Sequence, residues 1–270
     1  MNENSEPKQR PKRTPEQMRR MVDAIVETGK NTGNTDDHEI NSESFRKRPW
    51  SVYRKDAARY VAEYGRITRW YPKLDTLPDR LKTRHEKGER VLIVDIFGVA
   101  NAKSIGADKT IGFTLRKSQA IEKSPDMTVV DGDVFSTRDQ QKLMRAIDSE
   151  HAPISCVFLF PIEGLKYHGQ NIAVLSKLYG LLRKLYLRLA EEGEIYAHVD
   201  HSVAGAVLVR ALNALSETPI CEYDKENADK FDEIHGFRIV KHRDAPTSLP
   251  NINELPISER DRKILEDELS

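Results

Sequence analysis

Three aspartates follow short apolar runs in the central part of the chain. Asp95 ends the run Val91–Val94, and Asp131 and Asp133 follow the run Met127–Val130. A carboxylate in such a position can accept hydrogen bonds from the hydroxyl or amino groups of a ligand. Runs that are apolar throughout are typical of strands in a parallel sheet that is covered on both faces. We therefore expect a nucleotide-like ligand near Asp95, because the turn after the first strand of such a sheet usually binds one.

The segment 91–115 has the pattern of one strand–turn–helix–strand unit. A turn with Gly98 and Ala100 follows the first apolar run, and a short helical stretch comes next. Gly106 then leads into a second apolar run at 110–113. This unit is where the sequence most clearly indicates a ligand site.

From Arg90 onward the pattern alternates between strand and helix. This alternation predicts an α/β fold with an open, mostly parallel, doubly wound sheet and right-handed crossovers. The expected strands are 91–94, 110–114, 127–130, 154–160, 194–199 and 237–240, and the expected helices are 138–147, 172–190, 203–215 and a charged C-terminal helix within 257–269.

The first 44 residues are predicted to be a leader that contains one amphipathic helix. Residues 1–13 are polar and are expected to be disordered. Thr14 and Pro15 are typical of a helix start, and Gly29 suits its end. Residues 30–44 have the composition of a linker. The apolar face of this helix either docks on the body of the protein or binds a partner.

A helical cap rich in aromatic and basic residues is expected at 45–86, before the α/β domain at 87–250 and a C-terminal tail at 251–270. Trp50, Tyr53 and Tyr60 alternate there with Arg54 and Arg59, and the pattern continues to residue 84. Such side chains could stack on bases and bind the phosphates of a nucleic acid. The alternative is that the aromatic side chains pack on the sheet and the arginines are solvated.

Composition excludes few classes of protein. Lys+Arg and Asp+Glu both number 43, so net charge provides no general attraction to nucleic acid or to an anionic membrane. We expect no membrane span, since no apolar run approaches the length of about 20 residues that one needs. The N-terminus lacks an apolar signal core, so the cytoplasm is the default expectation. Cys156 and Cys221 have no metal-ligand spacing.

Together these features resemble the class I S-adenosylmethionine-dependent methyltransferases, over residues 90–244. The segment 91–95 looks like the family's first motif, an apolar strand that ends in an acid. Residues 106–113 look like the entry into the second strand, and 131–133 are similar to the Gly-Asp pair whose Asp binds the adenine amino group. Residues 189–196 resemble the approach to the fifth strand.

The resemblance implies a Rossmann-like fold and S-adenosylmethionine as cofactor. In that family a nucleophile of the acceptor attacks the sulfonium methyl group, and the enzyme positions both reactants and removes a proton where needed. The acceptor itself is undetermined. The residues that the resemblance assigns to cofactor binding are Asp95, Phe97, Gly98, Ala100, Thr114, Asp131, Asp133, Val134 and Phe160.

Several of these assignments have an alternative. Asp95 either binds the methionine amino group through water or caps the short helix that follows. Asp133, and more weakly Asp131, either accepts from adenine or caps a turn. After the fourth strand, Glu163 and His168 are candidates for accepting a proton or orienting the acceptor, or they are solvated loop residues. No metal site is expected, because a helix-capping role for Asp200 or Ser202 is favoured over metal binding near the end of the fifth strand.

The chain also departs from the family in three places. The first turn has a single glycine, Thr114 stands where the family has an acid that binds the ribose, and residues 160–163 lack the family's polar motif after strand four. Two hypotheses therefore remain open: a methyltransferase, and a methyltransferase-like scaffold that binds nucleic acid or a protein without cofactor. A nicotinamide-dependent oxidoreductase is disfavoured, since the glycine pattern that binds its phosphates is missing.

Overall fold

The structure is a computed structural model that describes residues 73–96 except 75, 105–114, 125–159, 172–223 and 234–269. The predicted leader at 1–44 and the aromatic part of the predicted cap, through Tyr71, lie outside these ranges.

The described strands form one seven-stranded mixed sheet in the order β3-β2-β1-β4-β5-β7-β6. Strands β1 to β5 are parallel, and β7 runs antiparallel to both of its neighbours, β5 and β6. This confirms the predicted open, mostly parallel α/β sheet, and the fold is Rossmann-like. The strands are β1 Leu92–Ile96, β2 Lys109–Thr114, β3 Met127–Asp131, β4 Ile154–Leu159, β5 Leu189–Ser202, β6 Cys221–Tyr223 and β7 Ile234–Val240.

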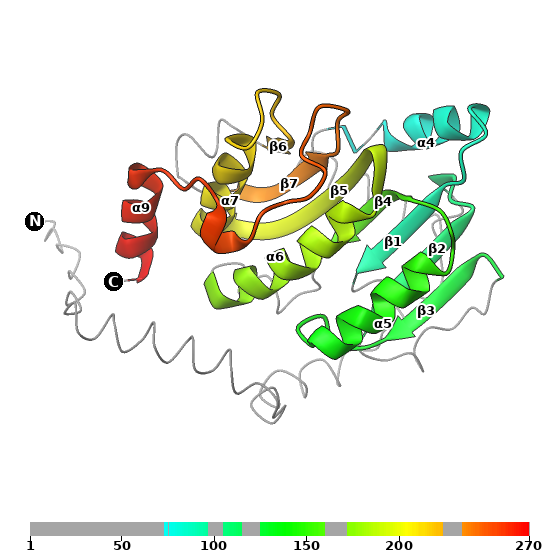
Figure 1. Cartoon of the computed structure of the whole chain (residues 1–270), viewed down its shortest axis with the longest axis horizontal. Coiled ribbons are helices and arrows are strands. Elements are labelled where there is room, and N and C mark those ends of the chain that lie inside the picture. The colour runs from blue at the N-terminus through cyan, green and yellow to red at the C-terminus, as the bar shows by residue number, and fades with distance from the viewer. Residues whose placement is uncertain are drawn as a thin grey trace, which may run out of the picture.

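The four described α-helices after residue 136 agree with the predicted ones to within about three residues at each end, whereas the helix at 77–86 lies within the predicted cap, for which no single helix was delimited. Helix α4 lies at the end of the sheet where β1 begins, whereas the arrowheads of β1 and β3 point towards the opposite end (Figure 1). Helix α5 runs alongside this part of the sheet. The helices are α4 Leu77–Glu86, α5 Thr137–Asp148, α6 Ile172–Leu187, α7 Val203–Asn213 and α9 Glu259–Leu269, with a 3-10 turn at Ile252–Glu254.

Apolar side chains cover both faces of the sheet, as its apolar strands require. On one face, Leu143 of α5, Leu185 of α6 and Leu208 of α7 pack in one core with Val94 and Val157. On the other face, α4 contributes its leucines to a second core of buried residues, which comprises Leu74, Leu77, Leu81, Val91, Ile93, Ile105, Ala107, Cys156, Phe158 and Tyr196.

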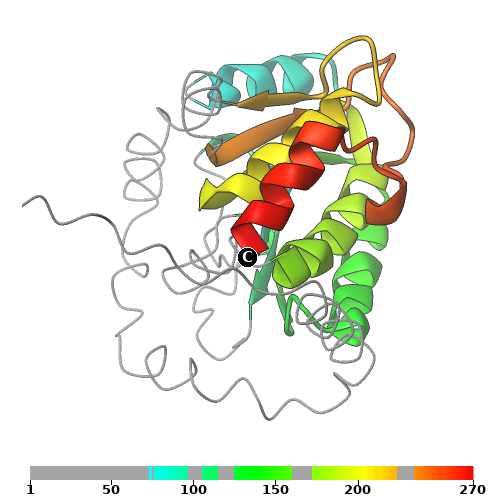
Figure 2. The same ribbon diagram turned by 90° about the vertical axis from the view of Figure 1, so that its left-hand side faces the viewer.

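The C-terminal helix α9 lies beside α7 (Figure 2). Arg210 of α7 donates from Nε to Oδ1 of Asp261 at 2.8 Å, and Asp261 is buried. The hydroxyl of Ser258 accepts from the backbone N–H of Asp261 at 3.1 Å, which caps the start of α9. The tail is therefore part of the folded body. Among the described residues, no helix is long and apolar enough to cross a membrane.

The structure corrects the end of the long helix before the fifth strand. Helix α6 ends at Leu187, and residues 191–193 are an irregularity inside β5 instead of a turn that precedes it. Glu192 has a positive φ of 57°, and a Cβ at Gly193 would lie 2.9 Å from the backbone oxygens of Ala190 and Ile154. Such crowding requires glycine there.

Candidate ligand site at the carboxyl ends of the parallel strands

The carboxyl ends of β1, β2 and β3 bring three of the predicted site residues together. In the strand register Asp95 pairs with Gly112, and Thr114 pairs with Asp131. Asp95 is buried, with 3% of its surface exposed, whereas Asp131 is exposed. Asp95 and Asp131 belong to the face opposite α5, because the residues next to them, Ile96 and Val130, pack in the core on the α5 side.

Gly112 of β2 pairs with Asp95 of β1 and has no side chain beside it. It lies inside β2, the strand next to the edge strand β3, and pairs with β1 on one side and with Val129 of β3 on the other. A glycine inside a strand is typical of a place where another group approaches the backbone closely. The arrangement therefore suits a ligand that crosses the ends of β1 and β2.

Residues 131–136, which we call the strand-end loop, connect β3 to α5. The side chain of Asp133 accepts at Oδ1 from the backbone N–H of Phe135 at 2.8 Å, and its carbonyl accepts from the N–H of Ser136 at 3.0 Å. Asp133 therefore caps its own turn, which is one of the two roles expected for it. Val134 is buried with 4% exposure.

The first turn of α5 fixes the loop from the other side. Ser136 is the N-cap residue, and its hydroxyl accepts from the N–H of Asp139 at 3.3 Å. The carboxylate of Asp139 in turn accepts from the N–H of Asp133 at 3.0 Å. Hydrogen bonds from the side chain of Lys142 and from that N–H lower the pKa of Asp139. An ionised carboxylate thus holds the loop against the helix.

Gly132 permits this close contact between the loop and α5. A Cβ at this position would lie 2.6 Å from Cβ of Asp139 and 2.9 Å from Cε2 of Phe113. The glycine in the Asp-Gly-Asp sequence is therefore explained by packing against α5 and β2.

Six of the predicted site residues lie outside the described ranges. They are Phe97, Gly98, Ala100, Phe160, Glu163 and His168. Their roles in cofactor binding and proton transfer stay predictions. Asp200 and Ser202 belong to β5, which continues to Ser202, and helix α7 follows directly at Val203.

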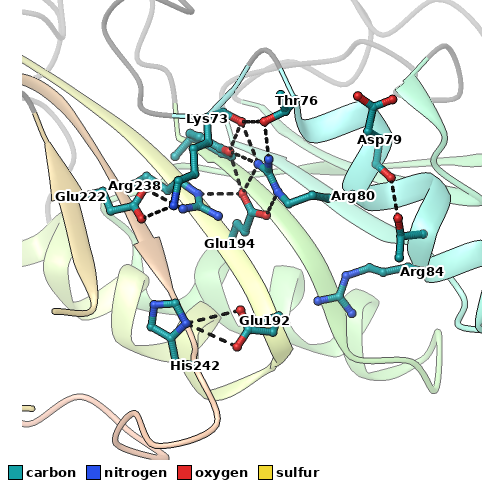
Figure 3. A network of polar contacts seen from close by, with 12 residues as sticks. Lys73, Thr76, Asp79, Arg80, Arg84, Glu192, Glu194, Glu222, Arg238 and His242 are labelled. Carbon is teal, nitrogen blue, oxygen red and sulfur yellow. Dashed lines mark hydrogen bonds and ion pairs between the residues drawn. The ribbon is translucent and has the colours of Figure 1, made fainter. Parts of the chain in front are cut away.

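A second polar cluster, which the sequence did not predict, lies under α4 (Figure 3). Glu194 of β5 is at its centre, with a side chain that is 4% exposed. It accepts from Nε of Arg80 at 2.6 Å, from Nε of Arg238 at 2.9 Å and from the hydroxyl of Tyr196 at 2.6 Å. The guanidinium of Arg238 also donates to Glu222 at 2.7 Å, and Lys73 binds the other oxygen of Glu222 at 2.8 Å. We call these six residues the Glu194 network.

The Glu194 network holds α4 on the sheet. Burial raises the pKa of Glu194, but the hydrogen bonds from Arg80 and Arg238 outweigh this effect and bring the pKa to about 2. Arg80 also donates to the hydroxyl of Thr76 at 2.7 Å and to the carbonyl of Lys73 at 2.8 Å. Each charged group of the network thus binds another member of it, and these contacts attach α4 to β5 and β7.

Sequence signals for the network existed, but they were weak. Glu194 and Arg238 are charged residues inside two predicted strands, of opposite sign, and buried charges in proteins are paired. The sequence could not show that β7 returns beside β5, which brings the two side chains together.

Comparison with known proteins gives distant structural neighbours. No family model and no curated protein sequence matches the chain. A short-chain dehydrogenase/reductase (glucose/ribitol dehydrogenase) from Brucella melitensis shares 14% identity over 47% of this chain and 69% of its own, with a TM-score of 0.35.

Two methyltransferases are also among the neighbours. CalS10 from Micromonospora echinaspora, an amino pentose methyltransferase solved with S-adenosylmethionine bound, has 12% identity, covers 53% of this chain and 56% of its own, and has a TM-score of 0.32. A protein assigned as a ribosomal RNA methyltransferase from Plasmodium falciparum has 12% identity, covers 61% of this chain and 93% of its own, and has a TM-score of 0.37. At this level of similarity the neighbours do not distinguish between the two activities.

Proposed function

We propose that this protein transfers a methyl group from S-adenosylmethionine to an acceptor that is still to be determined. The observation that carries the proposal is the placement of Asp95, Thr114 and Asp131 at the carboxyl ends of three adjacent parallel strands, beside a fixed strand-end loop. In open α/β sheets ligands bind outside these ends, where the strand order reverses. Here the order reverses between β1 and β4.

Asp131 compensates for the acid that the chain lacks at the end of β2. The resemblance places a ribose-binding acid at Thr114, which has no carboxylate. The register pairs Thr114 directly with Asp131, so the end of the neighbouring strand offers an exposed carboxylate. A carboxylate can accept from both hydroxyl groups of a ribose. The residues present thus fit an adenosine-bearing cofactor.

The topology of the sheet counts against a nicotinamide-dependent oxidoreductase. The dinucleotide-binding fold has the strand order 3-2-1-4-5-6. In this protein the antiparallel β7 lies between β5 and β6. This departure and the missing phosphate-binding glycines both count against such an enzyme.

In this proposal the residues of the chain bind the cofactor and orient the acceptor. S-adenosylmethionine supplies the electrophilic methyl group, so the protein needs few reactive side chains. Asp131 and Asp95 would bind polar groups of the cofactor, and the strand-end loop would keep one conformation beside it. Glu163 and His168 are proposed to accept a proton from the acceptor or to orient it.

Calorimetric titration with S-adenosylmethionine and S-adenosylhomocysteine tests the proposal. We expect binding by the wild type, and a loss of affinity of about 10- to 100-fold in Asp131→Asn, because hydrogen bonds to a charged group contribute about 1.5–3 kcal/mol. Asp79→Asn is the matched control, since Asp79 is exposed on α4. Absence of binding by the wild type at millimolar ligand would exclude a methyltransferase.

The second candidate function is a binding module without cofactor. It is favoured by one observation: an oxygen of the Asp133 carboxylate accepts from its own loop, at the N–H of Phe135. A nucleic acid is one class of partner for it, through the region 48–84. Arg80 and Arg84, at the end of that region, bind Glu194 and Glu89 within the protein. Nucleic-acid binding that falls steeply with salt, without cofactor binding, would support this candidate.

A further inference from the structure

We propose that Gln140 and Lys184 are positioning residues for the strand-end loop, so that helix α6 controls the shape of the cofactor site through α5. This inference rests on the proposed function for its effect on affinity. Its structural part, the control of the loop, can be tested without any ligand.

The side chains of Lys184 and Gln140 and the backbone carbonyl of Val134 form a continuous chain of hydrogen bonds. Nζ of Lys184 in α6 donates to Oε1 of Gln140 in α5 at 2.8 Å. Nε2 of Gln140 donates to the carbonyl oxygen of Val134 at 2.6 Å. The chain therefore links α6 to the middle of the loop, across a separation of 44 positions in the sequence between its first two members.

The chemistry of the three groups fixes their orientation. An ammonium group only donates hydrogen bonds and a carbonyl oxygen only accepts them, so the amide of Gln140 must turn its oxygen to Lys184 and its nitrogen to Val134. Gln140 is 5% exposed, and it is one of the few buried polar residues among the described ones. A buried amide whose partners were lost would remain without hydrogen bonds, which is unfavourable.

Three other hydrogen bonds that fix the loop are local, and they involve Asp133 itself and Ser136 and Asp139 in the first turn of α5. The contact from Gln140 differs, because its donor is held by a second helix that packs in the same core. The Lys184–Gln140 pair thus transmits the position of α6 to the carbonyl of Val134, next to Asp133.

The substitution Gln140→Glu separates positioning from packing. It keeps the size of the side chain and gives Lys184 an ionised partner, so that α5 and α6 stay joined. It removes the only group of the side chain that can donate to Val134, and it turns a carboxylate oxygen towards that carbonyl. Gln141→Glu is the matched control, because Gln141 is the neighbouring residue and is exposed.

Two measurements test the inference. Hydrogen exchange, followed by NMR without ligand, should be about tenfold faster at the amide of Phe135 in Gln140→Glu and unchanged at Ile147, near the other end of α5. Calorimetry with S-adenosylhomocysteine should show an affinity about tenfold lower. Gln141→Glu should behave as the wild type does in both.

The outcomes separate the two proposals. Unchanged exchange at Phe135 in a folded Gln140→Glu variant would overturn the positioning role. Faster exchange at Phe135, together with no binding of S-adenosylhomocysteine by the wild type, would retain the positioning role and reject the proposed function. If Gln140→Glu does not fold, Lys184→Met replaces it. That variant removes the donor that orients the amide, and the same acceleration at Phe135 is expected, while wild-type exchange there would overturn the inference.

Discussion

The Glu194 network and the strand-end loop are both polar clusters next to a helix, but they are built from different groups. In the network, side chains of opposite charge bind one another, and the buried Glu194 lies between the half-buried Arg80 and the buried Arg238. In the loop, backbone groups provide most of the contacts, and Asp131 stays exposed at the end of its strand.

Of the two clusters, the strand-end loop is better suited to bind a ligand. A buried charge that already binds its partners would have to break those contacts to bind anything else, at a cost of several kcal/mol. The carboxylate of Asp131, in contrast, lies at the surface at the end of β3, where a ligand can reach it. We therefore assign stability to the network and ligand binding to the loop.

The largest expected effect comes from Glu194→Ala. The substitution removes the carboxylate that the buried Arg238 and the half-buried Arg80 share, and breaking the buried Arg238–Glu194 pair costs about 3–5 kcal/mol. The free energy of unfolding in urea measures this loss. Glu191→Ala is the control, because the side chain of Glu191 is exposed.

The same variant also tests whether the Glu194 network takes part in ligand binding. Where it remains folded, its affinity for S-adenosylhomocysteine should stay within about twofold of the wild type. A large loss of affinity in folded Glu194→Ala would mean that the network takes part in binding.

A smaller loss of stability is expected from Gly132→Ala in the loop. The added methyl group would overlap Asp139 and Phe113, and overpacking of this kind costs about 1–3 kcal/mol. In contrast to Glu194→Ala, this variant should lose affinity for S-adenosylhomocysteine as well as stability. Gly180→Ala is the control, since nothing lies within 4 Å of a Cβ at that glycine of α6. Unchanged affinity in Gly132→Ala would mean that the strand-end loop takes no part in cofactor binding.

Much of the fold could be predicted from the sequence because its strands are continuous apolar runs. The run before Asp95 and the run before Asp131 predicted β1 and β3 to within two residues at each end. Strand β6 was missed, because three residues with a glutamate in the middle form no apolar run. The irregularity at Glu192 and Gly193 was interpreted as a turn, since glycine is frequent in both.

The candidate site was predictable in part for the same reason. Asp131 and Asp133 stand out as turn residues after an apolar run, and their place at the strand ends follows from the fold. The contacts that fix them were not predictable. Gln140 is an ordinary polar residue in a helical pattern, and its partner Lys184 belongs to another helix. Arg80 and Glu194 are 114 positions apart.

Hydrogen exchange with and without S-adenosylhomocysteine shows which end of the sheet binds the cofactor. At saturating ligand, we predict slower exchange in a peptide that spans residues 127–136 and unchanged exchange in one that spans 189–196, where Glu194 lies. Exchange that stays the same in both peptides at millimolar ligand, or slows only in the second, would contradict the assignment of the cofactor site to the carboxyl ends of β1, β2 and β3.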